Sequence, residues 1–180
     1  MLPTETWPVA LRWATVVCGA GAGVASCVAM ARAGRAMKAS GGAGIVAIEL
    51  AGTPARAAAI KAAWGPGGRA AARRSLLADF AFVAAYVVVP VVVAGASAAV
   101  MRPRGWSGWT GTAIFSGWAM VAAGALDVVE NAALLAVLRA DRPAAALTRL
   151  AAFCARGKFL LVLVAPLPLA TAGIAALARV

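Results

Sequence analysis

Four long apolar runs that contain very few charged residues restrict this chain to a small number of folds. They cover about residues 9–31, 76–101, 112–138 and 158–178. Each run is long enough to cross a bilayer as a helix, which takes about 20 apolar residues. The chain is 63% hydrophobic, whereas soluble domains are roughly 45–50% apolar. The sequence therefore predicts an all-α membrane protein, a bundle of four transmembrane helices in a single domain of residues 1–180.

The only long polar segment, residues 32–75, contains the signals of a short helix. Thr53 and Pro54 suit the N-cap and the first position of a helix, and the glycine-rich stretch 65–68 is expected to end it. One side of this helix is apolar and the other is charged, with Ala57, Ile60 and Trp64 on the first and Arg56 and Lys61 able to reach water on the second. Two interpretations stay open: an amphipathic helix on the cytoplasmic membrane surface, or a connection packed on the bundle.

Glycine and proline inside the apolar runs predict local packing features. Gly19 and Gly23 form a small-xxx-small pattern, which lets another helix approach closely or merely reflects an alanine-rich sequence. Pro90 lies in the middle of the second run and predicts a kink. Pro166 and Pro168 are expected to bend the fourth run in the same way.

The distribution of basic residues predicts the orientation in the membrane. Thirteen of the 17 lysines and arginines fall in residues 32–75 and 139–158, and only four fall on the opposite side of the predicted bundle. Because basic loops stay in the cytoplasm, residues 32–75 and 139–157 are predicted to be cytoplasmic and both termini to lie outside. Three tryptophans mark the outer interface in this arrangement: Trp7, Trp106 and Trp109.

Composition excludes several classes of chemistry. The chain has no histidine, so it offers no Ser-His-Asp triad, no His-ligated haem and no His-based zinc site. Its cysteines, Cys18, Cys27 and Cys154, form no C-x-x-C pair. The net charge of +11 comes with no nucleic-acid motif, and no dinucleotide or P-loop fingerprint is present. Membrane lipids are therefore the expected partners of the basic residues, rather than nucleic acid.

The most informative residues are three acids inside apolar runs: Asp79, Asp127 and Glu130. A carboxylate at bilayer depth costs about 2.5–3.5 kcal/mol on insertion scales, so such residues normally face the bundle interior. Asp127, Glu130 and Asn131 share one helix face at this spacing. Two carboxylates so close are costly to ionise together, so the pair is expected to hold one proton or to share a cation, with a divalent ion as one candidate.

Further polar groups are predicted to converge on the same depth, in the cytoplasmic half of the bundle. Tyr86 follows Asp79 by two turns on nearly the same face, and Lys158 opens the fourth run. The functional interpretation is a cavity that opens to the cytoplasm. The structural interpretation is a network that sets the register of the helices. For Asp79 a further alternative is that an acid in the first turn of a helix complements the helix dipole.

Several short motifs stand between residues 44 and 162: Glu49-Leu50-Ala51-Gly52-Thr53-Pro54, Trp64-Gly65, Asp79-Phe80, Asp127-Val128-Val129-Glu130-Asn131 and Lys158-Phe159. Together they resemble an uncharacterised family of small bacterial four-helix integral membrane proteins. The resemblance implies a place in the bacterial inner membrane and one constellation of site residues, which adds Glu49 and Trp64 to those above. It also suggests that the segment around Glu49 folds over the cytoplasmic mouth and approaches Lys158. It brings no known activity.

Three functions are consistent with these residues. The first is a site for a lipid-like or other hydrophobic small molecule, in which Asp127 and Glu130 are the central acids. Glu49, Asp79, Tyr86, Asn131 and Lys158 would contact the ligand. If the protein is an enzyme, one of the central carboxyls would act as a general acid or base. The second is an oligomeric component of proton- or ion-coupled transport, and the third is an accessory subunit of a membrane complex that has no site of its own.

Overall fold

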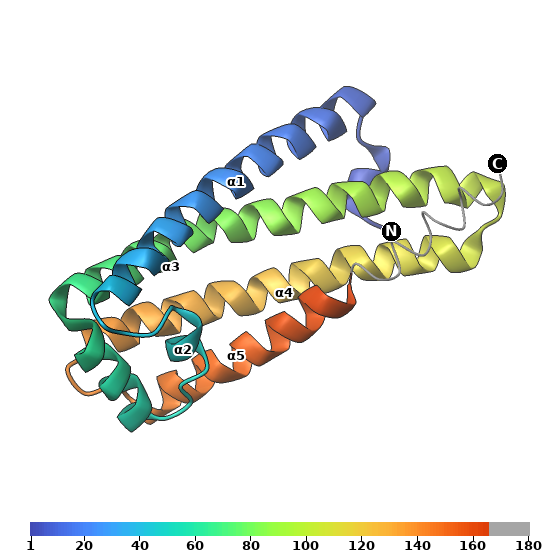
Figure 1. Cartoon of the computed structure of the whole chain (residues 1–180). Helices are drawn as coiled ribbons and strands as arrows, with labels where there is room; N and C mark the ends of the chain where they lie inside the picture. Colours follow the sequence, from blue (N-terminus) through green and yellow to red (C-terminus); the bar gives the residue numbers. More distant parts are fainter. Residues whose placement is uncertain (166–180) are drawn as a thin grey trace. The chain divides into compact units, whose positions relative to one another are not determined.

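The computed structural model describes residues 1–165, and helices are the only regular secondary structure in this part (Figure 1). The elements are η1 (Pro3–Thr6), α1 (Val9–Ala39), α2 (Val46–Glu49), α3 (Pro54–Met101), η2 (Arg102–Arg104), α4 (Ser107–Arg139) and α5 (Ala145–Val164). Three stretches are long and apolar enough to cross a membrane: Val9–Ala39, Pro54–Arg104 and Ser107–Arg139. The prediction of an all-helical chain with long apolar helices is thus confirmed.

The fourth predicted span, about residues 158–178, falls mostly outside the described residues. Helix α5 begins at Ala145, so the basic stretch before Lys158 is helical, and only the end of α5 belongs to the fourth run. Pro166 and Pro168 also lie outside the described residues. The count of four transmembrane helices therefore stays a prediction.

The chain forms two compact units, and each is described by itself. The first contains Met1–Gly21, Ala84–Gly124 and, among the described residues, 158–165; the second contains Ala22–Val83 and Ala125–Gly157. The long helices contribute residues to both units. The expectation of a single domain is not tested by this division.

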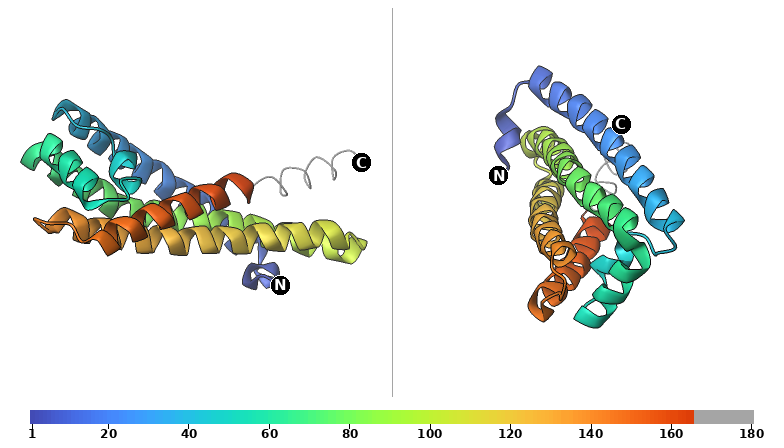
Figure 2. Two further views of the ribbon diagram at one scale, coloured as in Figure 1. Left: turned by 90° about the horizontal axis from the view of Figure 1, so that it is seen from below. Right: turned by 90° about the vertical axis from the view of Figure 1, so that its left-hand side faces the viewer.

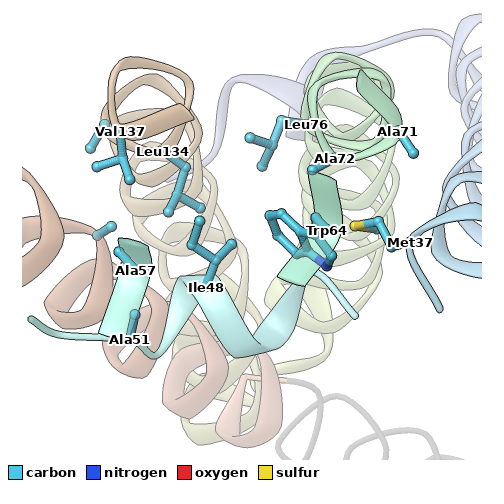
Figure 3. Packing of buried hydrophobic residues seen from close by; sticks show 12 residues of the cluster. Met37, Ile48, Ala51, Ala57, Trp64, Ala71, Ala72, Leu76, Leu134 and Val137 are labelled. Carbon is cyan, nitrogen blue, oxygen red and sulfur yellow. The ribbon is translucent and has the colours of Figure 1, made fainter. Parts of the chain in front are cut away.

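The core of the second unit gathers side chains from α1 to α5 (Figure 3). Trp64 and Ala57 are 1% and 0% exposed, and they pack with Ile48 of α2 and Leu134 of α4. The Trp64 Nε1 donates a hydrogen bond to the Ala43 carbonyl at 2.6 Å. The apolar side of residues 54–64 is therefore occupied by protein, which favours the packed connection over the helix on the membrane surface.

The short helix that begins at Pro54 ends at Gly65, where the stretch 65–68 was expected to stop it. Only Gly65 leaves the helical conformation, with φ 57° and ψ −167°. The chain changes direction there and the helix resumes at once (Figure 2). Glycine tolerates this positive φ, and Pro66 suits the first turn of the helix that follows. The helix that carries the second apolar run consequently begins about ten residues before the predicted start at Leu76.

Lys61 also departs from its prediction, since it is buried and does not reach water. Its Nζ donates hydrogen bonds to the carbonyls of Val137, at 2.8 Å, and Ala140. These carbonyls lie at the C-terminal end of α4, where backbone acceptors have no partner inside the helix. Arg56, on the same segment, is exposed as predicted.

In the first unit, the N-terminal residues dock onto α3 and α4. Leu2 is 1% exposed, and the Thr4 hydroxyl donates to the Val91 carbonyl at 3.0 Å. The contact depends on glycine, because a Cβ on Gly95 would lie 2.1 Å from Thr4 Oγ1 and one on Gly117 would lie 2.7 Å from Leu2 Cδ1. Residues 1–7 are thus a packed part of this unit.

The same unit bears on two predictions made from glycine and proline. A Cβ on Gly19 would lie 2.6 Å from Val89 Cγ2, so this glycine does permit close approach of α1 to α3. Helix α3 continues through Pro90, since Gly65 is its only residue with non-helical dihedral angles; the kink expected at Pro90 stays a prediction. Membrane helices tolerate proline where the freed backbone groups find other partners.

Candidate functional site

The acidic face of α4 is buried in the second unit. Asp127 is 4% exposed, and Glu130 and Asn131 are both 0% exposed. Helix α4 continues without interruption through these residues, so their spacing of three and four places them on one face, as predicted. Burial of two carboxyl groups on one turn is costly unless their surroundings compensate it.

Asp79 of α3 meets this face through Asn131. The Asn131 Nδ2 donates a hydrogen bond to Asp79 Oδ2 at 2.8 Å. The Asn131 Oδ1 is buried and accepts no hydrogen bond from residues 1–165. The structure thus brings together two of the predicted site residues, and it leaves one buried acceptor of the amide available.

The position of Asp79 within its helix overturns one interpretation. Because α3 resumes at Pro66, Asp79 lies more than three turns into that helix rather than in its first turn. The helix dipole acts mainly within the first and last turns. It therefore does not account for an acid at this position.

Glu49 belongs to the same unit as the acids of α3 and α4. It is the last residue of α2 and is 5% exposed. Its neighbour Ile48 packs in the core with Leu134. Four acids, on α2, α3 and α4, therefore belong to one compact unit.

Tyr86 and Lys158 belong to the other unit. Tyr86 packs against Ala119, Met120 and Ala165. Lys158 is 6% exposed, and its Nζ lies 5.2 Å from the centroid of the Phe159 ring, within the range of a cation–π interaction. The convergence of Tyr86 and Lys158 on the acids stays a prediction, as does the approach of the Glu49 segment to Lys158.

Within residues 1–165, no group of three or more cysteine and acidic side chains is arranged to hold a metal ion. Divalent cations bound by protein normally take several oxygen ligands. The cation shared by Asp127 and Glu130 stays a prediction.

Two polar features of the structure were not predicted from the sequence. One is the ion pair between Arg102 and Glu5, with Nη2 and Oε2 separated by 2.7 Å. The other is a cavity lined by Arg69, Arg73 and Arg139. The sequence signal for the cavity is that Arg69 and Arg73 lie in the basic stretch before the second apolar run, and that Arg139 directly follows the third.

No protein-family model, curated protein or solved structure matches this chain. The resemblance to a family of small bacterial membrane proteins therefore stays a prediction. The buried polar groups are therefore the basis for a proposed function.

Proposed function

We propose that this chain is a multi-pass protein of the bacterial inner membrane with four transmembrane helices. Its termini would lie outside and its two basic loops in the cytoplasm. The acids of the second unit would bind the polar head of a lipid-like or other hydrophobic small molecule. The site comprises Asp79, Asp127, Glu130 and Asn131, and Glu49 belongs to the same unit.

The observation that carries this proposal is that only one of the two polar atoms of the Asn131 amide makes a hydrogen bond within residues 1–165. Its Nδ2 is engaged by Asp79, whereas its buried Oδ1 accepts no hydrogen bond from residues 1–165. A buried polar atom without a hydrogen bond costs about 1–3 kcal/mol. A ligand that donates a hydrogen bond to Oδ1 would recover this free energy, and this favours a bound molecule over a purely structural network.

The acids around this amide restrict the chemistry of the ligand. Ionised carboxyl groups only accept hydrogen bonds, so the matching head group carries hydroxyl or amine donors. A largely apolar body is expected, because the site lies on helices that are long and apolar enough to cross a membrane. The ligand class is thus an amphipathic molecule whose head donates hydrogen bonds.

Native mass spectrometry of the protein released from nanodiscs tests the proposal. The Asp127→Asn/Glu130→Gln variant removes both negative charges with little change in shape, and Asp141→Asn makes the same change at an exposed acid. A defined small-molecule adduct is expected on the wild type and on Asp141→Asn, and it should be absent from the double variant. If neither the wild type nor the double variant carries an adduct and both are equally stable, the site does not bind such a ligand.

A second candidate function is a proton relay, favoured by the complete burial of Glu130 within the apolar part of α4. Buried ionisable residues in membrane spans commonly mark proton pathways. Liposomes that contain a pH-sensitive dye would show proton flux with the wild type and none with Glu130→Gln. A chain that neither retains a ligand nor carries flux, but that purifies with another protein, would instead be an accessory subunit.

A further inference from the structure

A cavity of about 220 Å³ opens on the second unit and is lined by three arginines. Its walls are Arg69, Ala70, Arg73, Leu135, Leu138 and Arg139, and we call it the arginine pocket. A single water needs only about 10–15 Å³ of such space. The pocket therefore has room for a phosphate group together with its hydration water.

The arginines come from two helices that meet at the pocket. Arg69 and Arg73 are one turn apart on α3, just after the kink at Gly65, and Arg139 is the last residue of α4. The Arg69 Nε donates to the Gly65 carbonyl at 3.2 Å, which restrains the guanidinium of Arg69. The kink thereby contributes to the shape of the pocket.

The residues that line the arginine pocket carry positive charge or none. Its described lining contains no carboxylate. None of the three arginines takes part in the ion pair between Arg102 and Glu5, which belongs to the other unit. Three like charges around one cavity repel each other, and a bound anion would remove that cost. Guanidinium groups are also well suited to phosphate, because their planar donors form paired hydrogen bonds with its oxygens.

The pocket combines this charge with an apolar wall. Leu135 and Leu138 line it from α4, and Ala70 lines it from α3. It lies where the apolar runs of both helices give way to basic residues, at about Leu76 on α3 and Arg139 on α4. A free phosphate ion would use the arginines alone, whereas a phospholipid would also place its glycerol and acyl chains against the leucines.

We infer that the arginine pocket binds the phosphate of one anionic phospholipid, with the acyl chains directed along α3 and α4. This site is separate from the proposed acidic site, since none of the acids of that site lines the pocket. It gives the protein a defined lipid contact in addition to the general attraction between basic loops and anionic membranes.

The test compares two triple variants with the same change in net charge. The pocket variant removes the three positive charges of the pocket and is Arg69→Gln/Arg73→Gln/Arg139→Gln. The control variant removes three other exposed arginines of the same unit and is Arg32→Gln/Arg35→Gln/Arg149→Gln. Each protein is placed in nanodiscs of phosphatidylglycerol and phosphatidylcholine. Native mass spectrometry then counts the lipids that remain after the loosely bound ones are stripped.

One phosphatidylglycerol is expected to remain on the wild type and on the control variant. The pocket variant should bind it roughly 100-fold more weakly, because each arginine near an anionic headgroup contributes about a factor of five. The single variant Arg73→Gln should lose about fivefold, which provides a test if the triple variant does not fold. Equal retention by both triple variants, or equal loss from both, would overturn the inference.

A second arm separates a lipid from free phosphate as the source of the anion. The wild type in phosphatidylcholine nanodiscs is supplied with inorganic phosphate, and its mass is compared with that of the pocket variant. No phosphate adduct is expected to survive, because a free ion would contact the arginines alone and would gain nothing from the apolar wall. A phosphate adduct that depends on the three arginines, without retention of phosphatidylglycerol, would show that the pocket does not bind lipid.

Discussion

Asn131 is the residue that links the two acidic helices of the second unit. It is completely buried on α4, yet its amide reaches the Asp79 carboxyl on α3. A hydrogen bond between an amide and a carboxylate is stronger than one between neutral groups, at about 1.5–3 kcal/mol. This residue therefore contributes to stability as well as to the proposed site.

A double-mutant cycle measures the link directly. Asp79→Ala and Asn131→Ala should each lower the unfolding temperature, but the two losses should not add. The expected coupling free energy is about 1.5–3 kcal/mol, because either variant alone already removes the hydrogen bond. Thermal unfolding in detergent, followed by tryptophan fluorescence, supplies the four values. Additive losses would contradict the contact.

Glu5 predicts a pH dependence at the N-terminus. Burial raises the pKa of its carboxyl, but the Leu2 amide and the nearby Arg102 lower it more, so the pKa falls below its ordinary value of 4.5. A lowered pKa means that the ionised group stabilises the fold above the ordinary value. This contribution is lost as the pH falls through the lowered pKa.

The comparison of Arg102→Gln with Arg104→Gln tests this dependence. Arg102→Gln should lower the unfolding temperature at pH 7, and its difference from the wild type should shrink as the pH falls below 4.5. Arg104 is a matched control, since its Nη1 donates to the Val100 carbonyl and not to Glu5. A deficit of Arg102→Gln that is the same at pH 3.5 and pH 7 would argue against an ionised Glu5 partner.

At the scale of elements, the docking of η1 requires glycine on α3. Gly95→Ala would place a methyl group 2.1 Å from Thr4 Oγ1, and overpacking of this kind costs about 1–3 kcal/mol. Gly111→Ala on α4 meets open space, and alanine is the better helix former by roughly 1 kcal/mol. The first variant should therefore unfold at a lower temperature than the wild type and the second at an equal or higher one. The same direction of change in both would show that η1 does not dock there.

The C-terminus of α4 depends on Lys61 in a comparable way. Lys61→Met keeps the bulk of the stem but removes the donors to the carbonyls of Val137 and Ala140. The expected cost is about 1–3 kcal/mol, together with faster hydrogen exchange in the last turn of α4. Arg56→Met changes an exposed charge on the same segment and should leave both unchanged. Unaltered exchange in Lys61→Met would mean that the lysine does not cap this helix.

The elements also show what hydropathy can predict and what it cannot. The apolar runs identified α1, α3 and α4, but α1 continues to Ala39, eight residues beyond its run. Hydropathy marks the length that suits lipid, whereas helix ends depend on capping and on tertiary contacts. The acidic face of α4 followed from local spacing. The burial of Lys61 did not, because its partners are 76 and 79 residues away in the sequence.

At the scale of the whole molecule, the unequal distribution of basic residues carries a prediction about topology. Thirteen lysines and arginines fall in two segments and four fall elsewhere. If the basic segments are cytoplasmic, α4 crosses the membrane from outside to inside. Its start at Ser107 and the loop after Arg139 must then be accessible from opposite sides.

Single cysteines at exposed positions test this crossing. After Cys18, Cys27 and Cys154 are replaced by alanine, one cysteine is introduced at Ser40, Ser107 or Asp141, all of which are exposed. In intact cells, a membrane-impermeant maleimide should label Ser107→Cys alone. Ser40→Cys and Asp141→Cys should react only after the membrane is opened, because their loops hold most of the basic residues. Labelling of Ser107→Cys and Asp141→Cys from the same side would mean that α4 does not cross the bilayer, and the four-helix arrangement would then have to be abandoned.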